Sequence, residues 1–191
     1  MRIVGPLHTA PLGTLAAFAA ALLVLPATAP AQDARVEVSL SARQLSLYSG
    51  GERAATWSIA VGQPEWPTPT GEWHIHQIDI NPDWTPPDSE WAEGSEYTEP
   101  GDPDNPMGRM RILYNPPYSI HGTDELESIG RAASHGSIRI ANENGWELAR
   151  RLMEASGDTR PESWWERVRG TPTEMFTVEL TNPIPIRVRD E

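Results

Sequence analysis

Apolar and polar residues alternate at period two along the part of the chain that follows residue 34. On either side of a short polar stretch at residues 41–43, the apolar positions are Val36, Val38 and Leu40, then Leu45 and Leu47. Strict alternation is typical of strands that bury one face. The pattern therefore predicts two strands joined by a turn. A third strand is predicted at residues 54–62, after the turn-forming Gly50 and Gly51.

More strands are predicted further along the chain. Pro69 and Gly71 form a rigid bend, after which strands are expected at residues 73–80, 109–114, 138–140, 177–180 and 184–188, and residues 118–120 lead directly into His121. Several strands joined by short turns precede any helical periodicity. The order of elements therefore predicts a mainly β fold.

Only one segment has a clear helical period. Between residues 143 and 156 the apolar residues recur at about 3.6 positions, and Gly157 follows as a stop signal. A shorter helical piece is expected at residues 161–169, because Pro161 suits a first turn. The helical content is thus one clear helix and short pieces.

Residues 81–107 form a long segment without periodicity, called the flap below. It contains six of the 19 prolines and seven acidic residues between Asp88 and Asp104, with no basic residue. Loops of this length in a compact domain are usually functional or disordered. We interpret Trp84 and the prolines as the framework of a flap over a substrate groove. The individual acids are interpreted as solvated charge, although they could also attract an amine on a substrate.

The first 31 residues have the features of a secretory signal peptide. Arg2 is followed by an apolar run at residues 12–25 and an Ala-Pro-Ala cleavage site at residues 29–31. An uncleaved membrane anchor is the alternative. Residues 32–191 suit a single domain. We therefore expect an exported protein of the periplasm or cell envelope.

Charge and composition exclude several classes of partner. The chain carries a net charge of −12, and its 15 basic residues are all arginine. Such a surface repels nucleic acid and anionic lipid. Disulfides and thiolate metal sites are excluded because there is no cysteine. His74 and His76 could ligate zinc with His121, or could simply face solvent. We expect a monomer without a metal or another cofactor.

The candidate chemistry is concentrated in residues 120–142. This stretch places His121 next to Gly122, and after a polar loop it reads Ser134-His135-Gly136-Ser137. A histidine is a possible base, and a glycine-containing turn can direct backbone N–H groups and a hydroxyl toward one point. This combination is typical of an acyl-transfer site.

The same stretch resembles the signature of the YkuD-type L,D-transpeptidases, which cross-link peptidoglycan. That signature reads IHGT, about a dozen residues, SHGC, then IRM and an Asn, and Ser137 occupies the position of the nucleophilic cysteine. Similar TPTG, NP-x-W-x-PP and NP-hydrophobe-G elements occur at residues 68–71, 81–87 and 105–108. The resemblance covers residues 35–188. It implies a β-sandwich or barrel-like catalytic domain and a cell-wall transferase that acts on stem peptides.

The resemblance also implies roles for individual residues. His121 would be the base, with one ring nitrogen held by the carbonyl of Gly122. The backbone N–H groups of His135, Gly136 and Ser137 would line the oxyanion hole.

On the substrate side, Arg139 would hold a carboxylate or brace the loop. Ser134 would cap the turn, and Trp84 would contribute to substrate binding as part of the flap. Asp124 and Glu125 lie near His121 in sequence, but no acid can be assigned to orient the imidazole.

Serine in place of cysteine leaves three hypotheses open. The first is an active transpeptidase, or a related peptidoglycan acyl transferase or peptidase, that uses Ser137. The second is a catalytically impaired relative that binds stem peptides, and the third is a zinc hydrolase that uses His74 and His76. A thiol near an imidazole can rest as thiolate, whereas the proton of a serine hydroxyl must leave during attack. A serine nucleophile is therefore expected to be slow.

Overall fold

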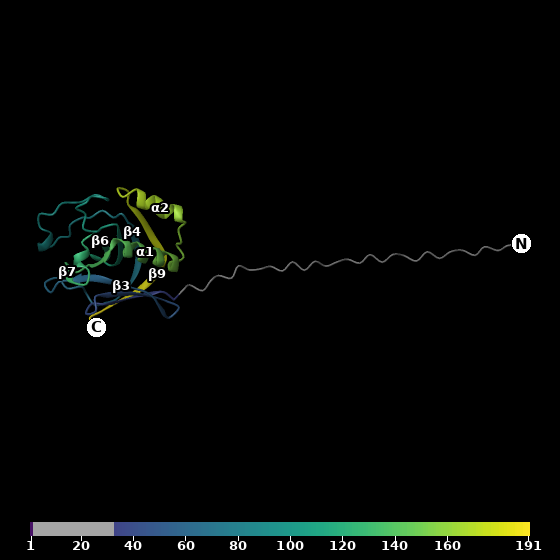
Figure 1. The fold of residues 1–191 in the computed structure, drawn as a ribbon, viewed down its shortest axis with the longest axis horizontal. Helices are drawn as coiled ribbons and strands as arrows, with labels where there is room; N and C mark the ends of the chain where they lie inside the picture. The colour runs from purple at the N-terminus through teal and green to yellow at the C-terminus, as the bar shows by residue number, and fades with distance from the viewer. Residues whose placement is uncertain (2–32) are drawn as a thin grey trace.

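Nine strands, two α-helices and two short 3-10 helices make up the part of the chain that the computed structural model describes, which is Met1 and residues 33–191 (Figure 1). Apart from Met1, the expected signal peptide at residues 1–31 lies outside the described residues. Within the described part, no helix is long and apolar enough to span a membrane.

The sheet contains strands from both ends of the domain. Their bounds are β1 (Arg35–Ser39), β2 (Gln44–Ser49), β3 (Glu52–Gly62), β4 (Gly71–Ile80), β5 (Met110–Asn115), β6 (Tyr118–Thr123), β7 (Ala132–Ser134), β8 (Ile138–Ala141) and β9 (Phe176–Arg189). The helices are η1 (Glu90–Ala92), η2 (Leu126–Ser128), α1 (Asn142–Ser156) and α2 (Glu162–Gly170).

Eight of these strands close into a barrel-like sheet. Their order is β2-β1-β9-β4-β5-β6-β8-β3, and β3 pairs back with β2, while β7 lies beside β3. The pairs β1–β9, β6–β8 and β3–β7 are parallel, and the other pairs are antiparallel. The predicted mainly β, barrel-like fold is confirmed.

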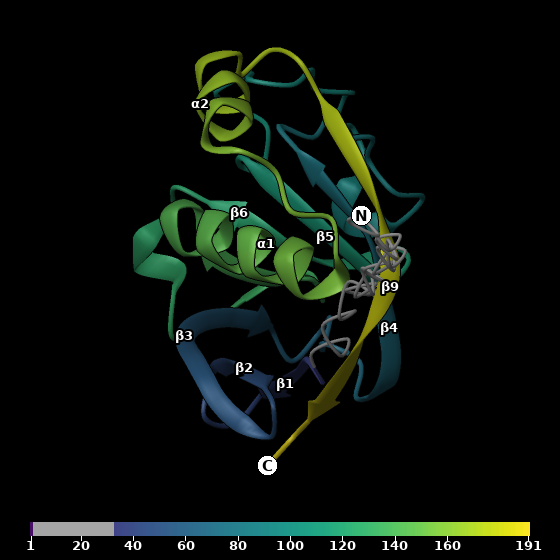
Figure 2. The same ribbon diagram turned by 90° about the vertical axis from the view of Figure 1, so that its right-hand side faces the viewer.

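Inward-facing aliphatic side chains fill the core. Helix α1 packs against β5, β6, β8 and β9, and it crosses the centre of the view in Figure 2. Leu148 and Leu152 of α1 are fully buried, as are Ile112 and Ile120 of the sheet. Each such side chain contributes roughly 1.5–3 kcal/mol to stability when it is buried. The core thus fixes the strands that carry residues 120–142.

The structure corrects two boundaries. The predicted strands at residues 177–180 and 184–188 are one continuous strand, β9. The pairing of β4 with β9 shifts register between Ile75 and Gln77. This bulge lets Ile75 and Ile78 both point inward although they are three residues apart. Helix α2 begins at Glu162, with Pro161 as the residue before it, so this helix is displaced by one position.

The other main elements agree with the sequence pattern. The burial of β1 and β2 alternates as predicted. Helix α1 starts one residue earlier than expected and stops at Gly157, whose φ of 92° is left-handed. Glycine adopts that conformation without the strain that a Cβ would bring.

Candidate active site

Sheet register brings the candidate residues onto one face. Across neighbouring strands, Arg111 of β5 lies opposite His121 of β6, and His121 lies opposite Arg139 of β8. Paired residues in a sheet share a face, and so do residues two apart along a strand. Ser137 precedes Arg139 by two residues, and its Oγ accepts a hydrogen bond of 3.2 Å from the backbone N–H of Ser119. Ser137, which directly precedes β8, therefore lies beside the stretch of β6 that carries Ser119 and His121.

His121 is buried, with 3% of its surface exposed. Its Nδ1 lies 2.9 Å from the carbonyl oxygen of Gly122. Because a carbonyl can only accept, Nδ1 carries the proton and Nε2 holds the lone pair of the neutral ring. Gly122 therefore contacts the imidazole as the resemblance implied.

Burial lowers the pKa of His121 from its ordinary 6.5 to about 4. The positive charges of Arg139 and Arg111 lower the pKa further, whereas the carbonyls of Gly122 and Pro106 favour the protonated ring. Burial outweighs these carbonyls. The imidazole is consequently neutral at pH 7, as a base must be before it accepts a proton.

Asn142 connects the segments that position His121. Its Oδ1 accepts the backbone N–H of Arg109 at 2.9 Å, and its Nδ2 donates to Asp124 at 2.8 Å. A Cβ on Gly122 would overlap Asn142 Oδ1, and a Cβ on Gly108 would lie 2.6 Å from the Gly122 carbonyl carbon. Only glycine permits these close approaches. Sequence reasoning placed Asn142 at the end of the motif but gave it no role.

The turn before Ser137 is closed by Ser134. The Ser134 hydroxyl donates to the Ser137 carbonyl at 2.5 Å and is almost fully buried. Gly136 has a φ of 103°, and a Cβ there would lie 2.5 Å from the ring of Tyr118. Within the described residues, no loop hydrogen bond is donated by the backbone N–H groups of His135, Gly136 or Ser137. These donors remain available beside the Ser137 hydroxyl.

Aromatic rings connect the turn to the flap. The His135 ring stacks on Trp91 of η1 at 4.2 Å between centroids, and it meets the edge of Trp66 at 4.8 Å. Trp84 stacks on Trp91 at 6.4 Å, so it stands one ring farther from the motif. Partial burial and the charge of Arg139 lower the pKa of His135. Sequence reasoning missed Trp66 and Trp91, although a tryptophan within the acidic flap was a usable signal.

Polar contacts fasten the base of the flap. The Asn81 N–H donates to the Arg109 carbonyl at 2.9 Å, and Arg109 Nε donates to the Asn81 side chain at 2.8 Å. Trp84 and Thr98 pair through two backbone hydrogen bonds. The flap is therefore an ordered loop whose ends meet.

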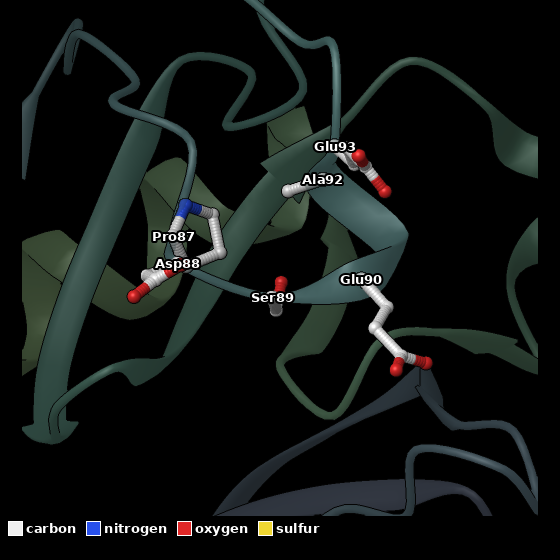
Figure 3. A pocket seen from close by; sticks show the side chains of 6 residues that line it. All are labelled: Pro87, Asp88, Ser89, Glu90, Ala92 and Glu93. Atoms are coloured by element: carbon white, nitrogen blue, oxygen red, sulfur yellow. The ribbon is translucent and has the colours of Figure 1, made fainter.

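A surface pocket around η1 is formed by flap residues. None of the lining residues belongs to the motif. They are Pro87, Asp88, Ser89, Glu90, Ala92 and Glu93 (Figure 3). The pocket carries three acids and no base. It shares no lining residue with the face that holds His121.

Buried Asp79 holds Arg111. Arg111 Nε and Nη2 both donate to Asp79 Oδ2, at 3.1 and 2.9 Å. The other carboxylate oxygen accepts from Gln77 and Thr177, each at 2.8 Å. A buried carboxylate needs such partners, because an unpaired one would be costly. Asp79 of β4 thus holds in place the positive charge of Arg111, the neighbour of His121 across the sheet.

His74 and His76 are both exposed. Met1 and residues 33–191 contain no group of three or more His, Asp or Glu residues that could hold a metal ion. The geometry gives no support to the zinc hydrolase hypothesis.

Comparison with known proteins identifies the family. The YkuD model, described as the L,D-transpeptidase catalytic domain, matches residues 33–175. The YkuD protein of Bacillus licheniformis is 35% identical over 116 residues, which are 60% of this chain and 58% of that protein. The YbiS protein of Escherichia coli K12 is 30% identical over 160 residues, which are 77% of this chain and 51% of that protein. Both carry the name of L,D-transpeptidases. This chain spans little more than half of their lengths.

Solved structures show the same fold. An L,D-transpeptidase from Mycobacterium smegmatis has a TM-score of 0.51 at 15% identity, covering 83% of this chain and 59% of that one. L,D-transpeptidase 3 from Mycobacterium tuberculosis has a TM-score of 0.52 at 12% identity, covering 83% and 61%. The domain match and the shared fold lead to one conclusion: the chain belongs to the L,D-transpeptidase catalytic-domain family.

Proposed function

We propose that this protein is a peptidoglycan acyl transferase of the L,D-transpeptidase type, with Ser137 as nucleophile and His121 as base. The observations that support the proposal are the pairing of β6 with β8, in which His121 lies opposite Arg139, and the hydrogen bond from the Ser119 N–H to Ser137 Oγ. The family match supports the reaction class.

In the proposed reaction, Ser137 Oγ attacks the carbonyl carbon that precedes the terminal residue of a stem peptide. The hydroxyl proton passes to His121 Nε2 and then to the leaving amine of that terminal residue. This leaves an ester on Ser137. The amine of a second peptide attacks the ester carbonyl, a new amide forms, and the Ser137 oxygen regains a proton.

The other residues of the site have supporting roles in this proposal. Gly122 orients the imidazole, and the N–H groups of His135, Gly136 and Ser137 stabilise the oxyanion. One such donor is typically worth ~3 kcal/mol. Arg139 faces the substrate, Ser134 shapes the turn, and Trp84 supports Trp91 within the flap.

The cellular setting belongs to the same proposal. Residues 1–31 would direct export, and residues 32–191 would act as a single monomeric domain in the periplasm or cell envelope. This placement brings the site to its peptidoglycan substrate.

Two features make the reaction slow. A base with a pKa of about 4 has a weak affinity for the serine proton. The partner of His121 Nδ1 is also a carbonyl rather than a carboxylate. In serine proteases, making the orienting carboxylate neutral costs about 10⁴ in rate.

A binding-only function is the second candidate, and one contact favours it. Ser137 Oγ accepts the Ser119 N–H, and no hydrogen bond joins it to the His121 ring among the described residues. In that case the groove would hold stem peptides without cleaving them.

The test is turnover of a stem tetrapeptide in the presence of an amine acceptor peptide. Wild type should release the terminal residue and form the cross-linked product, and Ser137→Ala should do neither. Ser137→Cys should react faster than wild type, because a thiol of pKa ~8.5 loses its proton more readily. Peptide binding without release by wild type would establish the second candidate instead.

A further inference from the structure

The two guanidinium groups that flank His121 have different counter-ions. Arg111 is paired with Asp79, whose side chain is 1% exposed and which also accepts two further hydrogen bonds. Arg139 is paired with Glu125 at 2.8 Å; the Glu125 side chain is 66% exposed and the Arg139 side chain is 16% exposed. A buried, fully bonded carboxylate is a fixed partner, whereas a carboxylate that lies mostly in water loses little when it leaves its partner. Arg139 therefore has the counter-ion that is easier to exchange.

The backbone of Glu125 is held independently of its side chain. Its N–H donates to Thr123 Oγ1 at 3.1 Å, and its carbonyl accepts from Ser128 Oγ at 2.7 Å. The carboxylate can therefore leave Arg139 by side-chain rotation alone, without movement of η2. Such rotations of exposed side chains are fast, in the range of picoseconds to nanoseconds.

We propose that Glu125 is a stand-in carboxylate. It occupies Arg139 in the free protein and gives that guanidinium up to the terminal carboxylate of the donor peptide. This inference rests on the proposed function and adds a specificity-determining residue to it. Glu125 thereby competes with the substrate, and it sets how strongly the site prefers a peptide with a free carboxyl end.

The dimensions agree with this assignment. Arg139 follows Ser137 by two residues, a rise of about 6.6 Å along a strand. In the peptide, the terminal carboxylate lies one residue beyond the attacked carbonyl, about 3.6 Å when extended. The difference between the two lengths, about 3 Å, is shorter than an extended arginine side chain. The planar guanidinium of an arginine can donate two parallel hydrogen bonds to one carboxylate.

The flap offers no competing cation. The flap, residues 81–107, contains eight acidic residues and no basic one. A carboxylate that approaches the site from that side is therefore repelled by the flap and attracted by the sheet. The same charges direct the carboxyl end of a peptide toward Arg139.

The experiment measures binding of a stem tetrapeptide with a free terminal carboxylate and of its terminal amide by isothermal titration calorimetry. All proteins carry Ser137→Ala so that no turnover occurs. Glu125→Gln should bind the carboxylate peptide about two- to fivefold more tightly and leave binding of the amide unchanged. Glu127→Gln is the matched control, because Glu127 is an exposed neighbour with no ion pair among the described residues. Arg139→Gln should remove the preference for the carboxylate, which we expect to be roughly tenfold.

Each other outcome has a distinct meaning. If the carboxylate peptide binds but Glu125→Gln and Glu127→Gln change its affinity equally, the inference is overturned and the proposed function stands. An equal gain for carboxylate and amide peptides would likewise overturn it. If neither peptide binds any variant, the proposed function fails together with the inference.

Discussion

The sheet and the flap hold the two sides of the candidate site by different means. On the sheet side, His121 lies within a hydrogen-bonded strand between two neighbours, and Asn142 ties its surroundings together. The flap is fastened at its base by Asn81 and Arg109, and its Trp91 rests on His135. Reacting groups need positions fixed to a fraction of an ångström, whereas a covering loop must let substrate enter. Under the proposed function, the sheet would hold the reacting groups and the flap would control access to them.

Charge follows the same division, but hydrogen-bond satisfaction does not. Ser89 and Thr98 of the flap and Tyr114 of β5 all have buried hydroxyls with no hydrogen-bond partner among the described residues. The sheet presents Arg111 and Arg139 to the site, while the flap is entirely acidic. A peptide that bears both an amine and a carboxylate would be oriented between them.

The largest expected effect tests the burial of His121. Its pKa is about 4 in the folded protein, against 6.5 for the unperturbed side chain. Between these values the unfolded state binds the proton and the folded state does not. The stability contribution is therefore complete above pH 6.5 and is lost as the pH falls through about 4. The difference corresponds to roughly 3 kcal/mol.

The measurement is urea unfolding of wild type and His121→Gln across this pH range. Wild type should lose more stability than the variant as the pH falls, because only wild type has an imidazole that is protonated in the unfolded state and kept neutral by burial in the folded state. Parallel pH profiles would mean that His121 is not buried as described.

The next largest effect is the difference in stability cost between alanine at Gly136, in the turn before Ser137, and alanine at Gly94, in the flap. Gly136 and Gly94 both have a positive φ, at 103° and 81°. Alanine at either position brings a shared backbone strain of about 1–2 kcal/mol. At Gly136 the new Cβ also meets the Tyr118 ring, whereas at Gly94 nothing lies within 4 Å. Overpacking should therefore make Gly136→Ala about 1–3 kcal/mol more costly than Gly94→Ala in thermal or urea unfolding. Equal costs would contradict the tight packing of the turn.

The smallest effect concerns the flap. Trp91→Ala should raise the pKa of His135 toward its ordinary value, because it removes part of the burial that lowers this pKa. Global stability should change by no more than about 1 kcal/mol. Tyr97→Ala is the control, since Tyr97 is an exposed aromatic residue of the same loop. The His135 ring signals in an NMR pH titration report the pKa. An unchanged titration in Trp91→Ala would show that the stack does not form in solution.

The alternation of apolar and polar residues, as at Val36 and Val38, predicted most of the strands, but β7 was missed because its residues follow a segment interpreted as a polar loop. The motif also located His121, Gly122 and the Ser134 turn. The pairing of Asp79 with Thr177 and the stack of Trp91 on His135 could not be predicted. These contacts join residues far apart along the chain, and only the folded sheet sets their register. The continuous β9 was missed because its bulge depends on the partner strand.

The most direct test of the account is whether Ser137 becomes acylated. Intact-mass spectrometry after incubation with a reactive acyl donor, such as a carbapenem, should show wild type gaining the mass of the donor, with peptide mapping placing it on Ser137. His121→Gln should slow the reaction by about 10²–10⁴, and Ser137→Ala should gain no mass. Identical spectra for wild type and Ser137→Ala, in folded protein, would contradict the assignment of Ser137 as the nucleophile.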